Sequence, residues 1–179
     1  MKSLLANLSR VALIATALLG GCQTYISRTI LPQGERPPEF AVDVERDIAM
    51  LTSDGIALVA NVYRPKTNSR VPTILVRIPF TQSFKNNLGV DAVGRFWGSR
   101  GYNVVIQGTR GRFKSGGNFY PLVHERSDGI ETLQWLARQP WFDGRLAMWG
   151  GSAFGHTQWA ISDQNRNRES SAIPIPIRF

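Results

Sequence analysis

The amino-acid sequence predicts an α/β fold whose sheet is mostly parallel with an antiparallel start. Short, β-branched apolar segments alternate along the chain with segments whose apolar residues recur at helical spacing. Only the first two strand-like segments are joined by a tight turn, whereas helix-like segments separate most of the later ones. The composition, 42% hydrophobic with 10% aromatic residues, supports a sizeable core and excludes a disordered chain.

The predicted sheet begins with a hairpin. Residues 47–52 and 56–63 are strand-like, and the Asp-Gly pair within Ser53-Asp54-Gly55 suits a tight turn between them. Arg64-Pro65 ends the second strand. Residues 71–78 then form a continuous β-branched run, which is typical of a strand buried on both faces.

Helix-like and strand-like segments alternate from there. Residues 91–100 carry apolar side chains at helical spacing, and Gly101 would cap this helix. Residues 102–107 are predicted as a second buried strand, followed by the glycine-rich segment 108–117, which is too polar for the core and is predicted as a loop.

The next helix is predicted to begin at Ser127 and to stop at Pro140. Asp143-Gly144 then turns the chain into a strand at residues 145–149, and a further helix begins at Ala153. The order β-β-β-α-β-α-β-α implies right-handed crossovers between parallel strands.

The N-terminus has the features of an export signal. Lys2 and Arg10 precede the apolar run 11–19, which is too short to span a bilayer comfortably. The run ends in Leu19-Gly20-Gly21-Cys22, which resembles a bacterial lipobox. Cys22 is the only cysteine, so it cannot form an intrachain disulfide, and it is predicted to carry lipid.

These features divide the chain into three parts. Residues 1–21 are predicted as a lipoprotein signal peptide, residues 22–40 as a proline-containing tether, and residues 41–179 as the folded domain. The expected location is the bacterial cell envelope, on the periplasmic side of a membrane and anchored through Cys22.

The charge pattern argues against a nucleic-acid partner. The formal net charge is +8, but the 21 Lys and Arg residues are scattered and form no run. One cysteine and two separated histidines do not make a metal ligand set. No metal or organic cofactor is therefore expected.

The strongest motif for chemistry is Gly150-Gly151-Ser152-Ala153-Phe154-Gly155, between an apolar strand and a helix. A serine at such a turn is strained and needs small neighbours, as in the nucleophile elbow of serine hydrolases. The Ala153 N–H, at the start of the helix, would stabilise an oxyanion. The alternative is a glycine-rich turn that merely packs closely.

Several further segments, taken with the elbow, resemble the X-Pro dipeptidyl-peptidase and cocaine esterase family of α/β-hydrolases. They occur in the family's order over about residues 48–159: Ser53-Asp54-Gly55-Ile56-Ala57-Leu58, Val62-Tyr63-Arg64-Pro65, Val76-Arg77-Ile78-Pro79-Phe80, Gly101 to Gln107, Thr109-Arg110-Gly111, Ser115-Gly116-Gly117, Asp128 to Trp135, Asp143-Gly144-Arg145 and the elbow. The resemblance implies the N-terminal part of an α/β-hydrolase fold that lacks the later strands.

The resemblance also assigns roles to residues. Ser152 would attack an ester or amide carbonyl and form an acyl-enzyme, with the Ala153 N–H as one oxyanion donor. Phe80 occupies the position of the family's oxyanion tyrosine and has no hydroxyl, so Thr81 or Gln82 would have to replace it. Gly108 stands where the family usually has an aspartate, and Ala153 stands where it often has a tyrosine.

The family's catalytic aspartate and histidine follow the serine on later loops and have no counterparts here. His156, on the elbow helix, is a poor substitute because Ser152 should point away from the helix. His124 and Asp163 are expected to have surface or packing roles. Little or no turnover is therefore expected. The strand before Ser152 would also have an uncovered edge, since Pro174 and Pro176 disfavour a central strand at the end of the chain.

Three hypotheses stay open at this stage. The first is a serine hydrolase-family lipoprotein acting on small ester, amide or short peptide substrates, which needs more chain for activity. The second is a non-catalytic, membrane-anchored lipoprotein that binds a ligand or partner. The third is a protein completed by a second chain that supplies the acid and the histidine. The choice between peptidase, esterase and acylase and the oligomeric state stay open as well.

Overall fold

The computed structural model describes residues 36–81, 84–165 and 177–178. The predicted signal peptide, Cys22, most of the tether and Gln82 lie outside the described residues. The last two residues of the predicted tether belong with the folded domain, because the N–H groups of Glu39 and Phe40 both donate to the Ser99 carbonyl, at 2.8 and 3.0 Å.

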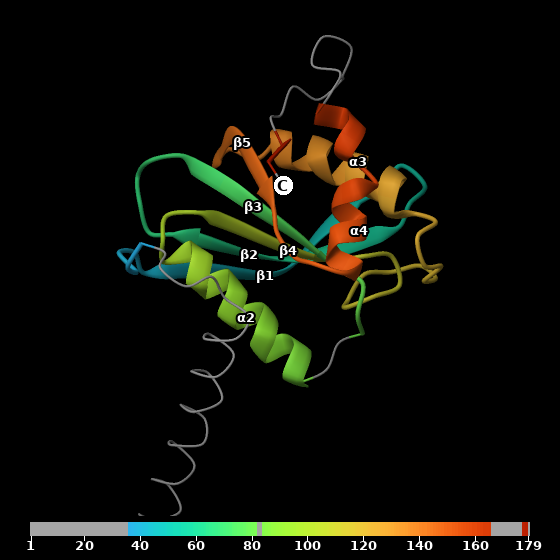
Figure 1. Ribbon diagram of the computed structural model, residues 1–179, viewed down its shortest axis with the longest axis horizontal. Coiled ribbons are helices and arrows are strands. Elements are labelled where there is room, and N and C mark those ends of the chain that lie inside the picture. The colour runs from blue at the N-terminus through green and yellow to red at the C-terminus, as the bar shows by residue number, and fades with distance from the viewer. Residues whose placement is uncertain (1–35, 82–83, 166–176, 179) are drawn as a thin grey trace, which may run out of the picture. The chain divides into compact units, whose positions relative to one another are not determined.

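One mixed sheet organises the domain, with the strand order β1-β2-β4-β3-β5-β6 (Figure 1). The strands are β1 (Val42–Leu51), β2 (Ala57–Pro65), β3 (Val71–Ile78), β4 (Asn103–Gly108), β5 (Phe142–Met148) and the two-residue β6 (Ile177–Arg178). β2 pairs antiparallel with β1 and with β4, whereas β3, β4, β5 and β6 run parallel. The prediction of a mostly parallel sheet with an antiparallel start is confirmed.

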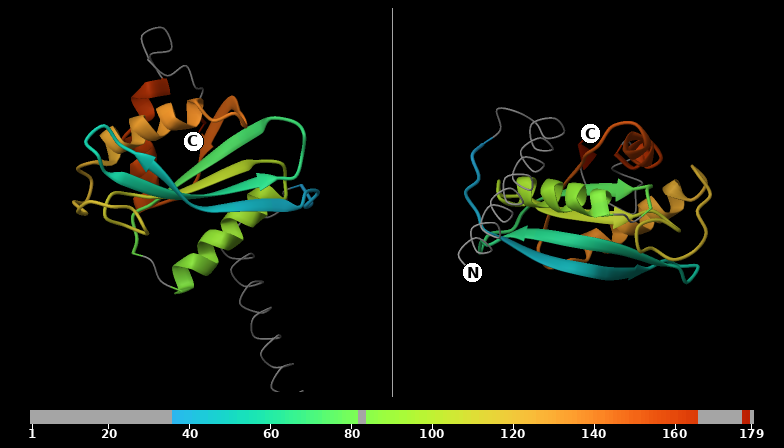
Figure 2. Two further views of the ribbon diagram at one scale, coloured as in Figure 1. Left: turned by 180° about the vertical axis from the view of Figure 1, so that it is seen from behind. Right: turned by 90° about the horizontal axis from the view of Figure 1, so that it is seen from below.

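Helices cover both faces of this sheet. They are α2 (Phe84–Gly98), α3 (Glu125–Ala137) and α4 (Ala153–Trp159), followed by the 3₁₀ helix η1 (Ser162–Asn165). Figures 1 and 2 show α2 on one side of the sheet and α3 on the other. The alternation of β2 explains this arrangement. Tyr63 packs against α2, where a Cβ on Gly94 would lie 2.5 Å from its ring, and Val62 belongs to the core under α3.

The main apolar core lies between the sheet and α3. Its buried members are Ala60, Val62, Leu75, Val105, Leu133, Leu136, Phe142, Leu146, Met148 and Ile161. α3 packs closely at Gly129, where a Cβ would lie 3.0 Å from Arg77 Nη1 of β3 and 2.7 Å from Ile161, which follows α4.

Arg77 links the start of α3 to the sheet from inside the domain. Its side chain is fully buried, and burial lowers the pKa of the guanidinium to about 10. Arg77 Nε donates to Gln107 Oε1 at 3.2 Å, and Nη1 donates to the Glu125 carbonyl at 2.7 Å. The Thr132 hydroxyl of α3 donates to the same Gln107 oxygen at 2.9 Å. The helix therefore has a fixed position over β3 and β4.

Several predicted boundaries are wrong, each for a local reason. β1 begins at Val42 and continues through an irregularity between Glu45 and Ile48, where Asp47 has a φ of 60°. α2 begins at Phe84, before the predicted residue 91. The prediction missed the first residues because the glycine and asparagines of 86–89 lower helix propensity, although they do not prevent the helix. β5 begins at Phe142 and includes the Asp143-Gly144 pair that was predicted as a turn.

The start of α3 also differs from the prediction. The helix begins at Glu125 with His124 as its N-cap, and Ser127 lies in the first turn, where its hydroxyl donates to the His124 carbonyl at 3.1 Å. Ser127 therefore does not cap the helix: its short side chain reaches the backbone of the preceding turn instead.

The predicted uncovered edge of β5 is partly covered. Ile177 and Arg178 of β6 pair with Leu146 and Ala147 of β5 in parallel. The pairing is possible because these two residues follow Pro176, so neither paired position is a proline.

Candidate active site

Ser152 lies in the turn between β5 and α4, with φ 57° and ψ −125°. A non-glycine residue in this region stores strain of order 1–3 kcal/mol, which persists only where the surroundings fix it. The residue is exposed. The geometry is that of a nucleophile elbow, which presents a serine hydroxyl beyond the carboxyl end of a strand.

Of the neighbouring glycines, Gly150 is the one whose absent side chain the turn requires. Its φ is 125°, and a Cβ there would lie 2.5 Å from Phe154 Cβ. A Cβ on Gly151 would meet nothing within 4 Å, and one on Gly155 would meet only the Gly150 carbonyl oxygen, at 3.8 Å. The expectation that the elbow needs small neighbours is thus confirmed at Gly150, while within the described residues Gly151 and Gly155 have space around them.

Ala153 is the first residue of α4, where helix N–H groups have no intrahelical acceptor. The Phe154 N–H donates to the Gly151 carbonyl and the His156 N–H to the Ser152 carbonyl, both at 3.2 Å. The Ala153 N–H is therefore the backbone donor that suits an oxyanion formed at Ser152.

Phe80 lies just beyond the carboxyl end of β3. The elbow follows β5, and because β3 and β5 are adjacent and parallel, both segments leave the sheet at the same edge. The Phe80 ring packs edge-to-face on Phe154, with 5.4 Å between the ring centroids. The side chain offers an apolar wall and no hydrogen-bond donor. Thr81 beside it is exposed and forms a parallel bridge with Phe113.

In the described residues, the side chains of His124, His156 and Asp163 make no hydrogen bond with the Ser152 hydroxyl. His156 contacts Ser152 through its backbone N–H. His124 lies at the start of α3, and the centroid of its ring is 6.2 Å from that of the Tyr120 ring. Asp163 forms two 2.7 Å bonds with Arg126, which lower the pKa of its carboxyl to about 2. Within the described part of the chain, neither a histidine nor a carboxylate hydrogen-bonds the Ser152 hydroxyl.

The loop after β4 reaches the same region, which the sequence alone did not indicate. The Phe113 N–H donates to the Phe80 carbonyl at 3.0 Å, and Phe113 has a φ of 55°. Arg112, next to it, places its guanidinium 3.7 Å from the centroid of the Phe119 ring. The Arg-x-x-x-x-x-x-Phe spacing is too long for a local pattern to indicate this stacking.

Gly108 begins this loop, and the fold leaves no room for the aspartate that the family usually has there. A Cβ on Gly108 would collide with the Arg112 carbonyl oxygen and lie 2.7 Å from Phe113 Cβ. The Ser115 hydroxyl donates to the Gly108 carbonyl at 2.8 Å. Glycine at this position is therefore coupled to the path of the Arg112-Phe113 segment.

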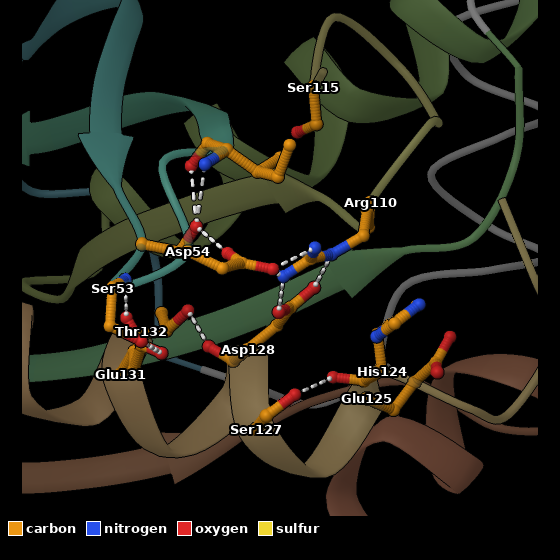
Figure 3. A network of polar contacts seen from close by, with 12 residues as sticks. Ser53, Asp54, Arg110, Ser115, His124, Glu125, Ser127, Asp128, Glu131 and Thr132 are labelled. Atoms are coloured by element: carbon orange, nitrogen blue, oxygen red, sulfur yellow. Dashed lines mark hydrogen bonds and ion pairs between the residues drawn. The ribbon is translucent and has the colours of Figure 1, made fainter. Parts of the chain in front are cut away.

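An ion network built on the buried side chains of Arg110 and Asp128 fixes the start of this loop (Figure 3). Arg110 bonds Asp128 of α3 through Nε at 3.1 Å and Nη2 at 2.6 Å, and Asp54 of the hairpin turn through Nη1 at 2.5 Å. The two carboxylates raise the pKa of Arg110 above its ordinary value, and the hydrogen bonds from Arg110 hold the pKa of the Asp54 carboxyl below its ordinary value. The loop, hairpin and helix are thereby tied together.

Among residues 36–81, 84–165 and 177–178, no three His, Cys, Asp or Glu side chains are grouped as metal ligands would be. None of the helices in the described residues has the length and hydropathy needed to cross a membrane.

Known proteins resemble both the sequence and the fold. Cocaine esterase from Rhodococcus sp. (strain MB1 Bresler) is 38% identical over 122 residues, which are 65% of this chain and 20% of the esterase. The chain thus spans about a fifth of that relative's length. A CocE/NonD family hydrolase from Staphylococcus aureus matches 68% of the chain with a TM-score of 0.57 and 23% identity, over 25% of its own length.

An α-amino acid ester hydrolase matches 76% of the chain with a TM-score of 0.58 and 20% identity, over 26% of its own length. The domain is therefore the N-terminal part of an α/β-hydrolase fold, as predicted. The model of the X-Pro dipeptidyl-peptidase (S15) family matches residues 54–176, which include the hairpin turn, the loop after β4 and the elbow. By this match and the geometry of Ser152, the chain belongs to the X-Pro dipeptidyl-peptidase (S15) family of serine hydrolases.

Proposed function

We propose that the protein hydrolyses ester or amide bonds, including acyl or X-Pro peptide bonds, through an acyl-enzyme on Ser152. The observation that carries this proposal is the backbone of Ser152, held at φ 57° between β5 and α4 in a chain of this family. A turn that only joined two elements would not need a strained serine at its exposed apex.

In the proposed reaction, Ser152 Oγ forms a bond to the carbonyl carbon of the substrate, and the carbonyl oxygen becomes an oxyanion that accepts from the Ala153 N–H. The bond to the leaving group then breaks, and the leaving group takes the serine proton. Water attacks the acyl-enzyme, releases the acid and returns a proton to Ser152. Both proton transfers need a general base, and we infer that it comes from outside the described residues.

The proposal is tested by trapping the acyl-enzyme. The protein is incubated with an activated ester, the reaction is quenched in acid, and the protein is digested. Mass spectrometry then measures the mass of the peptide that contains Ser152. An acyl adduct on Ser152 that is absent from Ser152→Ala supports the proposal. An adduct that Ser152→Ala leaves unchanged contradicts it and favours the alternative, a non-catalytic lipoprotein that binds a ligand or partner. Recovery of activity on adding a second chain would support the third hypothesis.

Phe80→Tyr is expected to speed acylation. Phe80 lies at the family's position for the second oxyanion donor, and its ring packs against the Phe154 ring beside the elbow, with the two ring planes at 73°. An oxyanion donor contributes about 10²- to 10³-fold to the rate, so a tyrosine hydroxyl should raise the acylation rate by about 10²-fold. The matched control is Phe154→Tyr, which adds the same hydroxyl on the other ring of the pair. Equal rates in wild type and Phe80→Tyr would show that position 80 does not face the oxyanion.

We also propose that the protein is exported and held on the periplasmic side of a bacterial envelope membrane by lipid on Cys22. The supports are the short apolar run at residues 11–19 and the small residues before the only cysteine. Several acyl chains on one residue would give stable anchoring, because two suffice where one is marginal.

Cys22→Ser is expected to abolish incorporation of radioactive palmitate and to release the protein from the membrane fraction. Ser27→Ala, in the same predicted tether, is the matched control and should leave both unchanged. Palmitate incorporation that persists in Cys22→Ser would contradict the proposal.

A further inference from the structure

We propose that the edge of the sheet opposite the elbow is a membrane-facing surface, which binds the phosphate groups of anionic phospholipids. Its centre is an open hollow of about 340 Å³, whose lining includes Arg64, Thr67, Ser69, Arg70, Asn103 and Trp141. The orientation rests on the lipid anchoring at Cys22 proposed above, and it leaves the elbow facing the aqueous phase.

The hollow and the elbow lie at opposite ends of the parallel strands. Asn103 is the first residue of β4, Arg70 directly precedes β3, and Trp141 directly precedes β5. Ser152, in contrast, follows the carboxyl end of β5. An eight-residue strand such as β3 is about 25 Å long, so a phosphate bound in the hollow is far from the nucleophile.

The chain enters the domain at the same edge as the hollow. The Lys66 N–H donates to the Ala41 carbonyl at 2.8 Å, and Lys66 lies between two residues that line the hollow, Pro65 and Thr67. Ala41 follows Cys22 by 19 residues, a length of chain that spans at most about 65 Å. A lipid on Cys22 would therefore hold the domain by this edge.

The charge of this edge suits an anionic membrane. Its segments 39–43, 64–71, 98–103 and 138–145 contain six Lys or Arg residues and three Asp or Glu residues. Three of these cations form ion pairs: Arg64 with Glu45, Lys66 with Asp43 and Arg145 with Asp143. Among the described residues, the other three have no carboxylate within ion-pair distance: Arg70, Arg100 and Arg138. Their charge stays available to a partner.

The hollow has hydrogen-bond donors that suit a phosphate. Arg70 is exposed, and a guanidinium binds two phosphate oxygens at once. The Ser69 N–H donates to Thr67 Oγ1 at 3.2 Å, which orders the loop beside Arg70. In the described residues, the hydroxyl groups of Thr67 and Ser69 donate no hydrogen bond, so both are available to a ligand.

Trp141 gives the hollow an amphipathic wall. Its ring packs against Trp135, with centroids 6.5 Å apart, at the margin of the apolar core. Asn103 Nδ2 donates to the Trp141 carbonyl at 3.3 Å and to the Val71 carbonyl at 3.1 Å, so it joins the starts of β5 and β3. Tryptophan is enriched where proteins meet the headgroup region of a membrane, which agrees with a lipid ligand.

The test measures how fast phenylglyoxal modifies individual arginines of the full chain on lipid vesicles. One set of vesicles contains only phosphatidylcholine, and the other contains phosphatidylcholine and phosphatidylglycerol in equal parts. Digestion and mass spectrometry give a rate for each arginine. Arg112 is the matched internal control, because it lies on the loop after β4 at the opposite edge and, in the described residues, also has no ion pair.

Phosphatidylglycerol is expected to slow the modification of Arg70 about fivefold and to leave the rate at Arg112 unchanged. The reason is that a basic side chain close to an anionic leaflet contributes about fivefold to membrane affinity. Inorganic phosphate at the same phosphate concentration should not protect Arg70. Protection by inorganic phosphate as strong as that by the vesicles would overturn the membrane as the ligand and assign the hollow to a soluble anion.

Variants assign the protection to the hollow, with Arg64 as the reporter. The protection of Arg64 by phosphatidylglycerol should be lost in Arg70→Gln and partly retained in Arg70→Lys, which keeps the charge but not the fork of donors. Arg112→Gln removes the same charge from the opposite edge and should leave it intact. Thermal unfolding confirms that each variant is folded, and the wild-type comparison of Arg70 with Arg112 needs no variant.

The outcomes separate this inference from the proposed anchoring. Equal slowing at Arg70 and Arg112, or no slowing at Arg70, overturns the membrane-facing surface. Protection of Arg70 in a chain that incorporates no palmitate supports the surface and contradicts only the lipid on Cys22. Palmitate on Cys22 without protection of Arg70 retains the anchoring and rejects this edge as the surface that meets the membrane.

Discussion

Replacing Arg110 by methionine is expected to lower the free energy of unfolding by about 3–5 kcal/mol, the cost of leaving one partner of a buried ion pair without the other. The Asp128 side chain is only 1% exposed, and both its carboxylate oxygens accept from Arg110, at 2.6 and 3.1 Å. Removing the guanidinium leaves this buried carboxylate without its cation. Urea unfolding of wild type and variant, followed by tryptophan fluorescence, measures the loss.

Two further variants make this prediction specific. Asp54→Ala removes the other carboxylate on Arg110, but the Asp54 side chain is 55% exposed, so its loss should be much smaller. The double variant Arg110→Met, Asp128→Leu removes both buried charges and should recover most of the stability lost in Arg110→Met. A double variant as unstable as the single one would show that the loss comes from altered packing of the loop instead of an unpaired charge.

The second large effect concerns turnover. The 179-residue chain is expected to hydrolyse 4-nitrophenyl butyrate about 10⁴- to 10⁶-fold more slowly than the esterase from Rhodococcus, the loss seen when a triad serine lacks its base. The physical reason is that His156 approaches Ser152 only through its backbone and His124 lies at the start of α3. An un-ionised serine hydroxyl is a poor nucleophile.

Release of 4-nitrophenolate under equal conditions compares the two proteins, with His156→Gln as the control. If His156 does not act as the base, this variant keeps the residual rate. A chain as fast as the esterase, or a residual rate lost in His156→Gln, would show that a base acts within these residues.

The fold could be predicted from the sequence wherever local chemistry and tertiary structure agree. β3 occupies residues 71–78 as predicted, because its β-branched run is buried on both faces. The hairpin turn at residues 53–55 also follows from local chemistry, since Gly55 has a φ of 84°. The start of α2 could not be predicted, because Gly89 and its asparagine neighbours disfavour a helix that tertiary contacts stabilise.

The site was predictable in part for the same reason. The elbow lies within one short segment, so its strand, glycines and helix are visible together in the sequence. Arg110 joins Asp54 and Asp128 from segments far apart in the chain, and the loop after β4 reaches Phe80 through the Phe113 N–H and the bridge between Thr81 and Phe113. Such contacts follow from sheet topology, which local spacing does not specify.

The rate of covalent labelling by a fluorophosphonate tests the central claim most directly: Ser152 is the nucleophile of the fold, and the residues described here do not activate it. We expect slow labelling of the 179-residue chain, over hours, at the peptide that contains Ser152, and no such labelling of Ser152→Ala. Rapid labelling that Ser152→Ala abolishes would contradict the claim that a base is missing. Labelling unaffected by Ser152→Ala would contradict the assignment of the nucleophile itself.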